Sequence, residues 1–319
     1  MARGRFCFKD FFTNMCNNCP RKCNVNRDLG EKGFCGADNI NIKVSRAALH
    51  FWEEPCISGV RGSGTIFFSY CPLKCVYCQN EKISRGTVGK NITIERLAQI
   101  MIELQNKGAH NINLVTPTHY VYQITKAIEK AKEDGLNIPI VYNTSGYELP
   151  EVIDYLAPYI DIYLTDFKYS NNEDALKYSK APDYVEYAME SLKRMVKHCR
   201  AEFYYDNFNE CEDETGKIKM MKRGVIVRHL MLPGKLIQGK NVLKRLFNEF
   251  GNEIYYSLMS QYTPLNIDSK YPELLGKVSD REYEKLADYA LRLGIENAFL
   301  QEGEAASESF IPDFDMSGV

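Results

Sequence analysis

The sequence predicts an α/β fold in which a partial (β/α)6 parallel barrel follows an irregular, cysteine-rich N-terminal lobe. After Gly64, short apolar segments typical of buried strands alternate with amphipathic segments of helical period. This alternation implies right-handed βαβ crossovers and a parallel sheet. Before Gly64 the periodic signal is weak, and most of the eleven cysteines lie within the first 80 residues. We therefore predict a cysteine-rich lobe over residues 1–60 and a barrel with a C-terminal extension over residues 61–319.

Each unit of the barrel has its own signal. The first strand is GTIFFSY, and the next segment carries apolar residues at i, i+3, i+4 and i+7 from Leu97 to Leu104, which predicts a helix that ends at Gly108. The remaining strands are expected at NINLV, IPIVY, YIDIYLT, GVIVRHLML and EIYYSLM, with helices near residues 120–134, 151–156, 184–198 and 239–250. A helix at 280–293 and a strand NAFLQ follow, and the acidic, aperiodic residues 202–222 indicate a surface insertion.

The composition is that of an ordinary globular protein. Hydrophobic residues make up 45% and charged residues 26% of the 319, and the formal net charge is −2. This balance opposes bulk attraction to nucleic acid or acidic membranes, and no apolar run is long enough to span a bilayer. The opening residues lack a clean apolar segment, and an odd number of cysteines disfavours a disulfide framework. We expect a cytoplasmic protein with no nucleic-acid or membrane partner.

The stretch CPLKCVYC, directly after the first strand, places Cys71, Cys75 and Cys78 on one loop. Three thiolates can hold three corners of a [4Fe–4S] cubane and leave the fourth iron open for a substrate or cofactor, as in a catalytic metal site. The alternative is a zinc site that a remote His or Cys completes. The loop follows the carboxyl end of a strand, where the functional residues of parallel barrels gather.

CPLKCVYCQN resembles the signature of the radical S-adenosylmethionine superfamily. The resemblance implies that the open iron chelates S-adenosylmethionine, and that the reduced cluster splits this cofactor into methionine and a 5′-deoxyadenosyl radical that abstracts hydrogen from a substrate. It also implies an external one-electron donor, such as flavodoxin or ferredoxin. Tyr77, just before the third cysteine, would lie near the adenine; otherwise it is a packing residue.

Over residues 64–264 the sequence is most similar to activating enzymes of glycyl-radical enzymes, including pyruvate formate-lyase activating enzyme. YNTSG, TDFK and VRHLMLPG resemble the elements that end the third, fourth and fifth strands of that family. By this resemblance four residues surround the cofactor: Asn143, Asp166, Lys168 and Arg228. Lys168 and Arg228 are donors suited to carboxylate or ribose contacts. The alternative for each is a solvated polar residue at a strand end.

The residues after the second strand depart from the activating-enzyme pattern. That family usually has a Gly-Gly-Glu there, whose carboxylate meets the amino group of the cofactor, whereas this chain has Thr116-Pro117-Thr118-His119. Backbone carbonyls or the Thr116 hydroxyl would have to accept those hydrogen bonds. His119 becomes a candidate on the substrate side, or a histidine at a helix start. The segment after CxxxCxxC also lacks the ferredoxin-like insert that many glycyl-radical activating enzymes carry. The N-terminal CxxCPRxC, FWEEPCISG and TPTHY together resemble one branch of the activating-enzyme group, for which the substrate does not follow from the family name.

Three further groups are candidates. Cys16, Cys19, Cys23 and Cys35 form a CxxCPxxC…CG pattern that can bind an auxiliary [4Fe–4S] cluster or structural zinc, with Cys7 or Cys56 as substitute ligands, or they are buried thiols. Glu53 and Glu54 in FWEEPC could include a general acid–base group, although such a pair is more often a solvated turn. After the sixth strand, Gln261 and Tyr262 are expected to face the substrate, and Tyr262 could pass a hydrogen atom or only pack.

These features together predict a radical S-adenosylmethionine enzyme that abstracts hydrogen from a carbon, with the glycine of a partner enzyme as the substrate that the activating-enzyme resemblance implies. The alternatives are hydrogen abstraction from a small molecule or another peptide, and a non-catalytic zinc or iron–sulfur protein.

Overall fold

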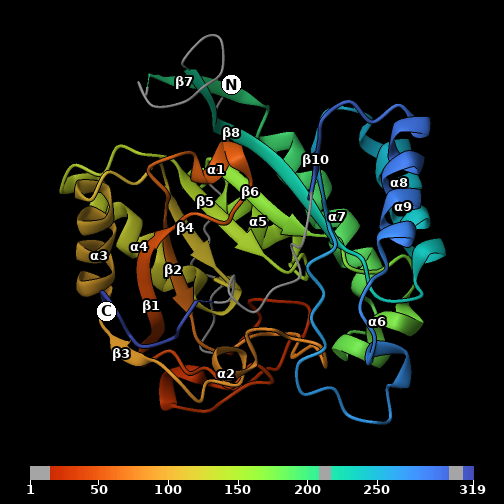
Figure 1. Ribbon diagram of the computed structural model, residues 1–319. Coiled ribbons are helices and arrows are strands. Elements are labelled where there is room, and N and C mark those ends of the chain that lie inside the picture. Colours follow the sequence, from red (N-terminus) through yellow and green to blue (C-terminus); the bar gives the residue numbers. More distant parts are fainter. Residues whose placement is uncertain (1–14, 208–216, 302–311) are drawn as a thin grey trace, which may run out of the picture.

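The computed structural model describes residues 15–207, 217–301 and 312–319, and it confirms a mixed α/β fold with a parallel sheet (Figure 1). The parallel strands follow the spatial order β2-β4-β5-β6-β8-β9-β10, and the antiparallel strands β1 and β3 extend the sheet beyond β2. Within the described residues the edge strands β3 and β10 do not pair, so the barrel is open. The strands are β1 (Ile42–His50), β2 (Ser63–Phe68), β3 (Lys90–Ile92), β4 (Ile112–Val115), β5 (Ile140–Thr144), β6 (Ile162–Asp166), β7 (Glu202–Asn207), β8 (Lys217–Leu230), β9 (Tyr255–Met259) and β10 (Ala298–Leu300).

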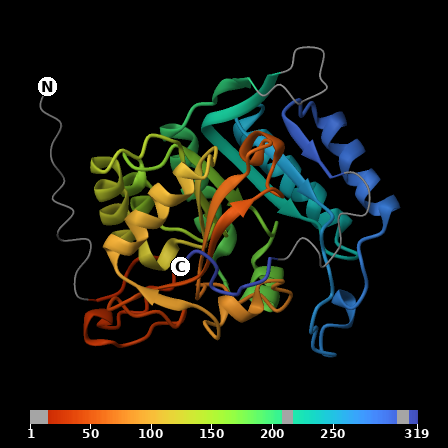
Figure 2. The ribbon, with the colours of Figure 1, turned by 60° about the vertical axis from the view of Figure 1, so that its left-hand side comes forward.

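The longer helices cover the outer face of this sheet (Figures 1 and 2). The pairs α3–α4, α5–α7 and α8–α9 pack against each other. The α-helices are α1 (Pro55–Ser58), α2 (Glu81–Ser84), α3 (Ile94–Asn106), α4 (Val121–Glu133), α5 (Pro150–Leu156), α6 (Asn172–Ser179), α7 (Tyr184–His198), α8 (Leu236–Phe250) and α9 (Asp280–Leu293), and short 3₁₀ turns lie at Arg27–Leu29, Thr118–Tyr120 and Pro272–Leu274. In the described ranges no helix combines the length and the apolar character needed to cross a membrane.

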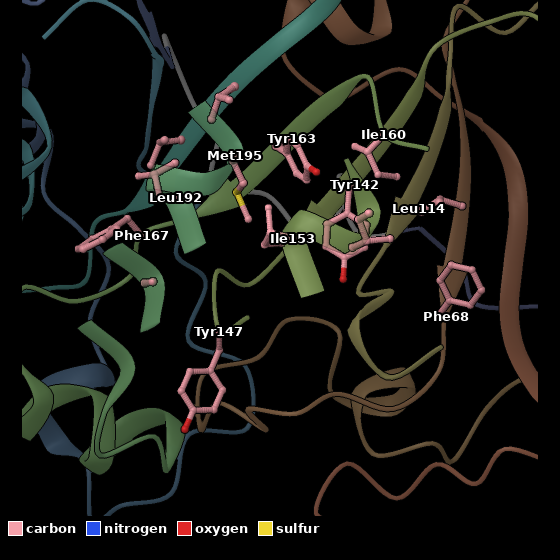
Figure 3. Close-up of a cluster of buried hydrophobic side chains, with 14 of the residues drawn as sticks. Phe68, Leu114, Tyr142, Tyr147, Ile153, Ile160, Tyr163, Phe167, Leu192 and Met195 are labelled. Carbon is pink, nitrogen blue, oxygen red and sulfur yellow. The ribbon is translucent and has the colours of Figure 1, made fainter. Parts of the chain in front are cut away.

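The main core lies between the helices and the outer face of the sheet. Side chains alternate along a strand, so every second residue of β4, β5 and β6 points outward. Tyr142 and Tyr163 are opposite each other in the β5–β6 register and face this layer, in which Ile153 of α5 and Met195 of α7 are also buried (Figure 3). The six predicted strands correspond to β2, β4, β5, β6, β8 and β9, and NAFLQ contains β10.

Two segments are more regular than their sequences indicate. Residues 42–50 lie in the lobe predicted to be irregular, but they form β1, which pairs with both β2 and β3. A register shift between Val44 and Arg46 interrupts the alternation that would have revealed this strand. The predicted insertion at 202–222 contributes β7 and the start of β8, which form an antiparallel hairpin that projects from the barrel (Figure 1). Residues 208–216, with Cys211, lie outside the described residues.

The segment between β1 and β2 closes the amino end of the barrel. Its short helix α1 packs against β8 (Figure 1). Cys56 and Ile57 of α1 are buried in a second core with residues from the inner faces of β5, β6 and β8: Val141, Ile162, Leu164, Met221 and Ile226. Residues 51–62, called the plug below, therefore fill the half of the barrel interior at the amino ends of the strands. The half at the carboxyl ends of the strands is left open for a ligand.

Residues 312–319 complete the edge of the sheet beside β1. The Met316 N–H donates to Ser45 O at 3.0 Å, and the Ala47 N–H donates to Ser317 O at 2.9 Å. β3 covers the preceding part of the same edge, from Ile42 to Val44. The outer edge of β1 is thus paired by two segments that are far apart in the sequence.

Candidate active site

A cavity of about 280 Å³ lies inside the barrel at the carboxyl ends of its strands. Residues that the sequence singled out at separate strand ends come together around it. Those that line it are Cys71, Cys75, Tyr77, Cys78, Thr116, Asn143, Asp166, Lys168, Arg228 and Gln261. The gathering follows from the topology, because parallel strands end on the same side of a barrel. Their functions stay predictions.

The cysteine loop turns sharply after β2. Tyr70 and Lys74 adopt left-handed backbone conformations, with φ of +79° and +56°, which reverse the chain on either side of Cys71. The Leu73 N–H donates to Cys71 Sγ at 3.4 Å, and the Ser179 hydroxyl donates to Cys75 Sγ at 2.9 Å. Burial raises the pKa of Cys71 to about 11 and that of Cys78 to about 12. These thiols therefore hold their protons until a metal displaces them.

The three thiols of the cysteine loop line one cavity, and Cys71 and Cys75 receive an amide and a hydroxyl hydrogen bond. Cysteines that hold a cubane bind three separate irons and leave the fourth iron open. The three thiols therefore fit a [4Fe–4S] cluster.

Several polar groups line the same cavity as the cysteines and could bind a second ligand. Lys168 Nζ lies 2.5 Å from Asp166 Oδ2. Burial alone would lower the pKa of Lys168, but the Asp166 carboxylate raises it above its usual value, so the ammonium persists. Ser145 also lines the cavity, and its buried Oγ has no hydrogen-bond partner. An unpartnered buried hydroxyl is costly unless a ligand satisfies it, so this wall fits a hydroxyl-rich group such as a ribose.

Thr116 stands at the carboxyl end of β4 with a φ of +58°. This left-handed conformation costs a β-branched residue about 1–2 kcal/mol, and strain of this kind clusters at functional sites. Its N–H donates to Asn143 O at 2.9 Å, which holds the turn against the neighbouring strand. The backbone has the conformation of a glycine, in the place where the activating enzymes carry Gly-Gly.

We expect Thr116→Gly to raise the free energy of unfolding by about 1 kcal/mol, because glycine adopts this conformation without strain and only part of the gain is offset by its extra freedom in the unfolded chain. Urea unfolding measures the difference. Thr116→Ala is the matched control, since it removes the hydroxyl and keeps the strained backbone. A gain of equal size in the alanine variant would contradict the strain argument.

Arg228 enters the cavity already engaged by two carboxylates. It donates to Glu54 Oε1 at 2.7 Å and Oε2 at 2.6 Å, and it also pairs with Glu53 Oε2. Asn113 Nδ2 donates to the other oxygen of Glu53 at 2.8 Å. Burial would raise the pKa of Glu54, but the Arg228 guanidinium lowers it below its usual value. Arg228 thus lines the cavity with its guanidinium already paired, and its contact with a cofactor stays a prediction. The alternative of a solvated Glu53–Glu54 turn is wrong, because the plug carries the two carboxylates into the barrel.

His119 and Tyr262 do not line the cavity, contrary to the expectation that they face the substrate. His119 is buried, its Nε2 lies 2.8 Å from Ser69 O, and burial lowers its pKa to about 3. The Tyr262 hydroxyl donates to Leu274 O at 2.5 Å in the outer core. Both side chains hydrogen-bond to backbone carbonyls and pack behind residues that line the cavity, His119 behind Tyr70 and Tyr262 behind Tyr77. Gln261 does line it, and its carbonyl accepts a hydrogen bond from Gln79 Nε2.

Two of the N-terminal cysteines, Cys16 and Cys35, lie near a buried arginine. Arg27 is 1% exposed and donates to Ala37 O, Asp38 O and His119 O at 2.7–3.2 Å, while Cys16 Sγ lies 3.9 Å from its Nη1. Burial raises the pKa of Cys35, and the Arg27 charge opposes this effect. All of these acceptors are carbonyls or a thiol, so a nearby thiolate would supply the counter-charge that Arg27 requires. Cys7, a predicted substitute ligand, lies outside the described residues.

The lobe also contacts the cysteine loop directly. Arg21, between Cys19 and Cys23, donates to Pro72 O at 2.8 Å and to Ser179 O at 3.2 Å. Its guanidinium lies 3.9 Å from the centre of the Phe34 ring, a cation–π contact that fixes its position. The two cysteine groups are therefore parts of one packed structure.

Sequence reasoning missed three polar residues around the site: Ser145, Tyr169 and Ser179. Ser145 lies within the YNTSG turn, two residues after Asn143, and this closeness in the sequence could have identified it as a residue of the site. Tyr169 and Ser179 carry no local signal, because their position beside Cys75 depends on the packing of α6 against the cysteine loop.

The sequence was compared with known proteins. A profile described as the radical SAM superfamily matches residues 65–207. An uncharacterized protein of Methanocaldococcus jannaschii, MJ0674, is 30% identical over 300 residues, which span 90% of this chain and 77% of that protein.

Among solved structures, Streptococcus suis SuiB bound to S-adenosylmethionine aligns with a TM-score of 0.48 and 15% identity over 75% of this chain and 52% of that one. SuiB bound to the precursor peptide SuiA aligns with a TM-score of 0.48 and 13% identity, over 74% of this chain and 47% of that one. This chain thus spans about half the length of these SuiB chains. The profile match begins in β2 and includes the whole cysteine loop, and we conclude that the chain carries a domain of the radical SAM superfamily.

Proposed function

We propose that this enzyme cleaves S-adenosylmethionine reductively and directs the resulting radical at the α-carbon of a glycine in a partner enzyme. The observation that carries the cleavage step is one cavity that is lined by the three cysteine thiols, by the Asp166–Lys168 pair and by Ser145. The glycine substrate rests on the YNTSG, TDFK and VRHLMLPG elements, each of which resembles activating enzymes.

The residues of the chain bind, orient and shield. Cys71, Cys75 and Cys78 would hold a [4Fe–4S] cluster through three irons, and S-adenosylmethionine on the open iron supplies the radical chemistry when both are present. Lys168 would donate to a carboxylate or ribose oxygen, and the unpartnered Ser145 hydroxyl to a ribose. Phe67, Phe68 and Leu73 line the same cavity and exclude water from it.

A second candidate is hydrogen abstraction from a small molecule or a basic side chain, and the floor of the cavity favours it. The two carboxylates of Glu53 and Glu54 share one counter-ion, the Arg228 guanidinium, so the three side chains together carry a formal charge of −1. The Asp166–Lys168 pair is neutral. No unpaired cation therefore faces a substrate among the described lining residues, which disfavours phosphate or carboxylate groups and favours an amine or guanidinium.

The N-terminal thiols are proposed to hold a second [4Fe–4S] cluster. The buried Arg27 charge, with carbonyl and thiol acceptors, supports an anionic thiolate group there. The contact of Arg21 with the catalytic loop supports a relay of electrons from an external donor, flavodoxin or ferredoxin. Exposure of such clusters to oxygen damages them, so we place the enzyme in the reducing cytoplasm.

The test of the cleavage step is anaerobic. After reconstitution with iron and sulfide and reduction with dithionite, the wild type is expected to convert S-adenosylmethionine to 5′-deoxyadenosine, as measured by chromatography, and Cys75→Ala is expected to lose all product. Cys199→Ala is the control, because Cys199 is a buried thiol remote from the cavity. A wild type that holds a reducible cluster and yields no product would exclude this function.

Isotope transfer separates the two substrate candidates. A partner glycyl-radical enzyme that contains α-deuterated glycine is expected to pass deuterium to 5′-deoxyadenosine and to acquire a protein radical visible by electron paramagnetic resonance. Transfer from a deuterated small amine without any protein partner would favour the second candidate instead.

A further inference from the structure

Three buried hydroxyls form an unbroken line from the cavity wall to a cysteine of the catalytic loop. Tyr77 Oη lies 2.7 Å from Tyr169 Oη, Tyr169 Oη lies 2.6 Å from Ser179 Oγ, and Ser179 Oγ lies 2.9 Å from Cys75 Sγ. Tyr77 is 7% exposed, and Tyr169 and Ser179 are fully buried. No solvent competes for these hydrogen bonds.

The Cys75 thiolate determines which hydroxyl donates and which accepts in each of these hydrogen bonds. A cysteine that ligates iron is a thiolate, which accepts hydrogen bonds and donates none. Ser179 must then donate its only hydroxyl proton to Cys75, and it can only accept from Tyr169. By the same rule Tyr169 accepts from Tyr77. All three O–H groups point toward the sulfur, and hydrogen bonds aligned in this way polarise and strengthen one another.

The backbone holds this line in place without help from the Ser179 hydroxyl. Ser179 is the last residue of α6, and the Val76 N–H of the cysteine loop donates to Tyr178 O at 2.8 Å. Arg21 joins the same two segments through Pro72 O and Ser179 O. Removal of the hydroxyl therefore leaves α6 docked against the cysteine loop, and the variant tests the hydrogen bond rather than the fold.

We propose that Ser179 is a positioning residue that sets the reduction potential of the catalytic cluster, with Tyr169 and Tyr77 aligned behind it. A hydrogen bond to a cluster thiolate withdraws electron density from the sulfur and stabilises the reduced state, which raises the potential. The one-electron donor is of the low-potential flavodoxin or ferredoxin class, so a higher cluster potential eases this transfer. The proposal rests on the proposed function, since it assumes that Cys75 ligates a cluster.

The test is an anaerobic redox titration of the reconstituted protein, without S-adenosylmethionine, followed by electron paramagnetic resonance of the reduced cluster. Ser179→Ala is expected to shift the midpoint potential of this cluster to a more negative value, and Ser179→Thr, which keeps a hydroxyl, to restore it. Tyr169→Phe, which removes only the second donor, is expected to shift the potential in the same direction by less. The control Ser191→Ala removes a buried hydroxyl that bonds to Gly146 O and Ala188 O, away from the cysteines.

Unchanged potentials in Ser179→Ala and Tyr169→Phe, with the cluster signal present, would overturn the inference and leave the proposed function standing. Loss of the cluster signal from the wild type itself would overturn the function on which the inference rests. The titration therefore distinguishes the two failures.

Discussion

Replacement of Arg228 by Met is expected to lower the free energy of unfolding by about 3–5 kcal/mol at neutral pH, because it leaves two carboxylates inside the barrel without their counter-charge. Glu53 and Glu54 are 7% and 5% exposed in their side chains, so water cannot replace the guanidinium. Urea unfolding followed by circular dichroism measures the loss.

The loss of stability in Arg228→Met is expected to depend on pH, and the pKa of Glu54 determines the direction of that dependence. In the wild type, Arg228 lowers the pKa of Glu54, so the stability that Glu54 contributes is present above its unfolded pKa and is lost as the pH falls through the folded value. In Arg228→Met, burial becomes the main effect on Glu54 and raises its pKa, opposed by the hydrogen bonds that Glu54 receives from the backbone and from Ser257. The variant should therefore lose least at pH 5 and most at pH 8.

The matched control for Arg228→Met also replaces Glu53 and Glu54 by Gln. This triple variant carries no buried charge at these positions and should regain most of the lost stability at pH 8. An equal loss at pH 5 and pH 8, with no recovery in the triple variant, would mean that packing rather than charge stabilises the plug.

The second large effect concerns iron content. Two four-iron clusters load roughly eight irons per chain, so replacing Cys71, Cys75 and Cys78 together by Ala should halve the iron to about four. Elemental analysis by mass spectrometry after anaerobic reconstitution measures this, and sulfide analysis should fall in parallel. The remaining four irons would belong to the N-terminal thiols.

The reciprocal variant, with Cys16, Cys19 and Cys23 replaced by Ala, should also keep about four irons per chain. If the N-terminal thiols instead bind zinc, the wild type will carry about four irons and one zinc, and the cysteine-loop variant will keep only zinc. Wild type with four irons and no zinc would show that the N-terminal cysteines are plain thiols.

Local patterns in the sequence predicted the strands that carry the site. A buried strand of five residues, such as β5 or β6, produces an apolar run that can be recognised in the sequence alone. A polar residue directly after the run indicates the carboxyl end of the strand, where the cavity lies. Asn143, Asp166 and Lys168 themselves were identified through the resemblance of YNTSG and TDFK to activating enzymes. β1 was missed because its bulge at Val44–Arg46 hides the period of two.

Contacts between distant residues could not be predicted from one sequence. Glu54 and Arg228 are 174 positions apart, and Cys75 and Ser179 are 104 apart. No local pattern states that the plug enters the barrel or that α6 docks beside the cysteine loop. His119 and Tyr262 were misjudged for the same reason, since a position beside a strand end does not determine which way a side chain points.

The pairing of residues 316–317 with β1 has a consequence for biosynthesis. Arg46 donates to Asp313 O, 267 positions away, and to Asp315 Oδ1, 269 positions away. Contacts of such separation form only after residues 313–317 have left the ribosome. Until then, the outer edge of β1 presents the unpaired Ser45 C=O and Ala47 N–H groups, and exposed strand edges are a template for aggregation. The nascent chain therefore passes through an interval in which this edge needs a chaperone or rapid release for its protection.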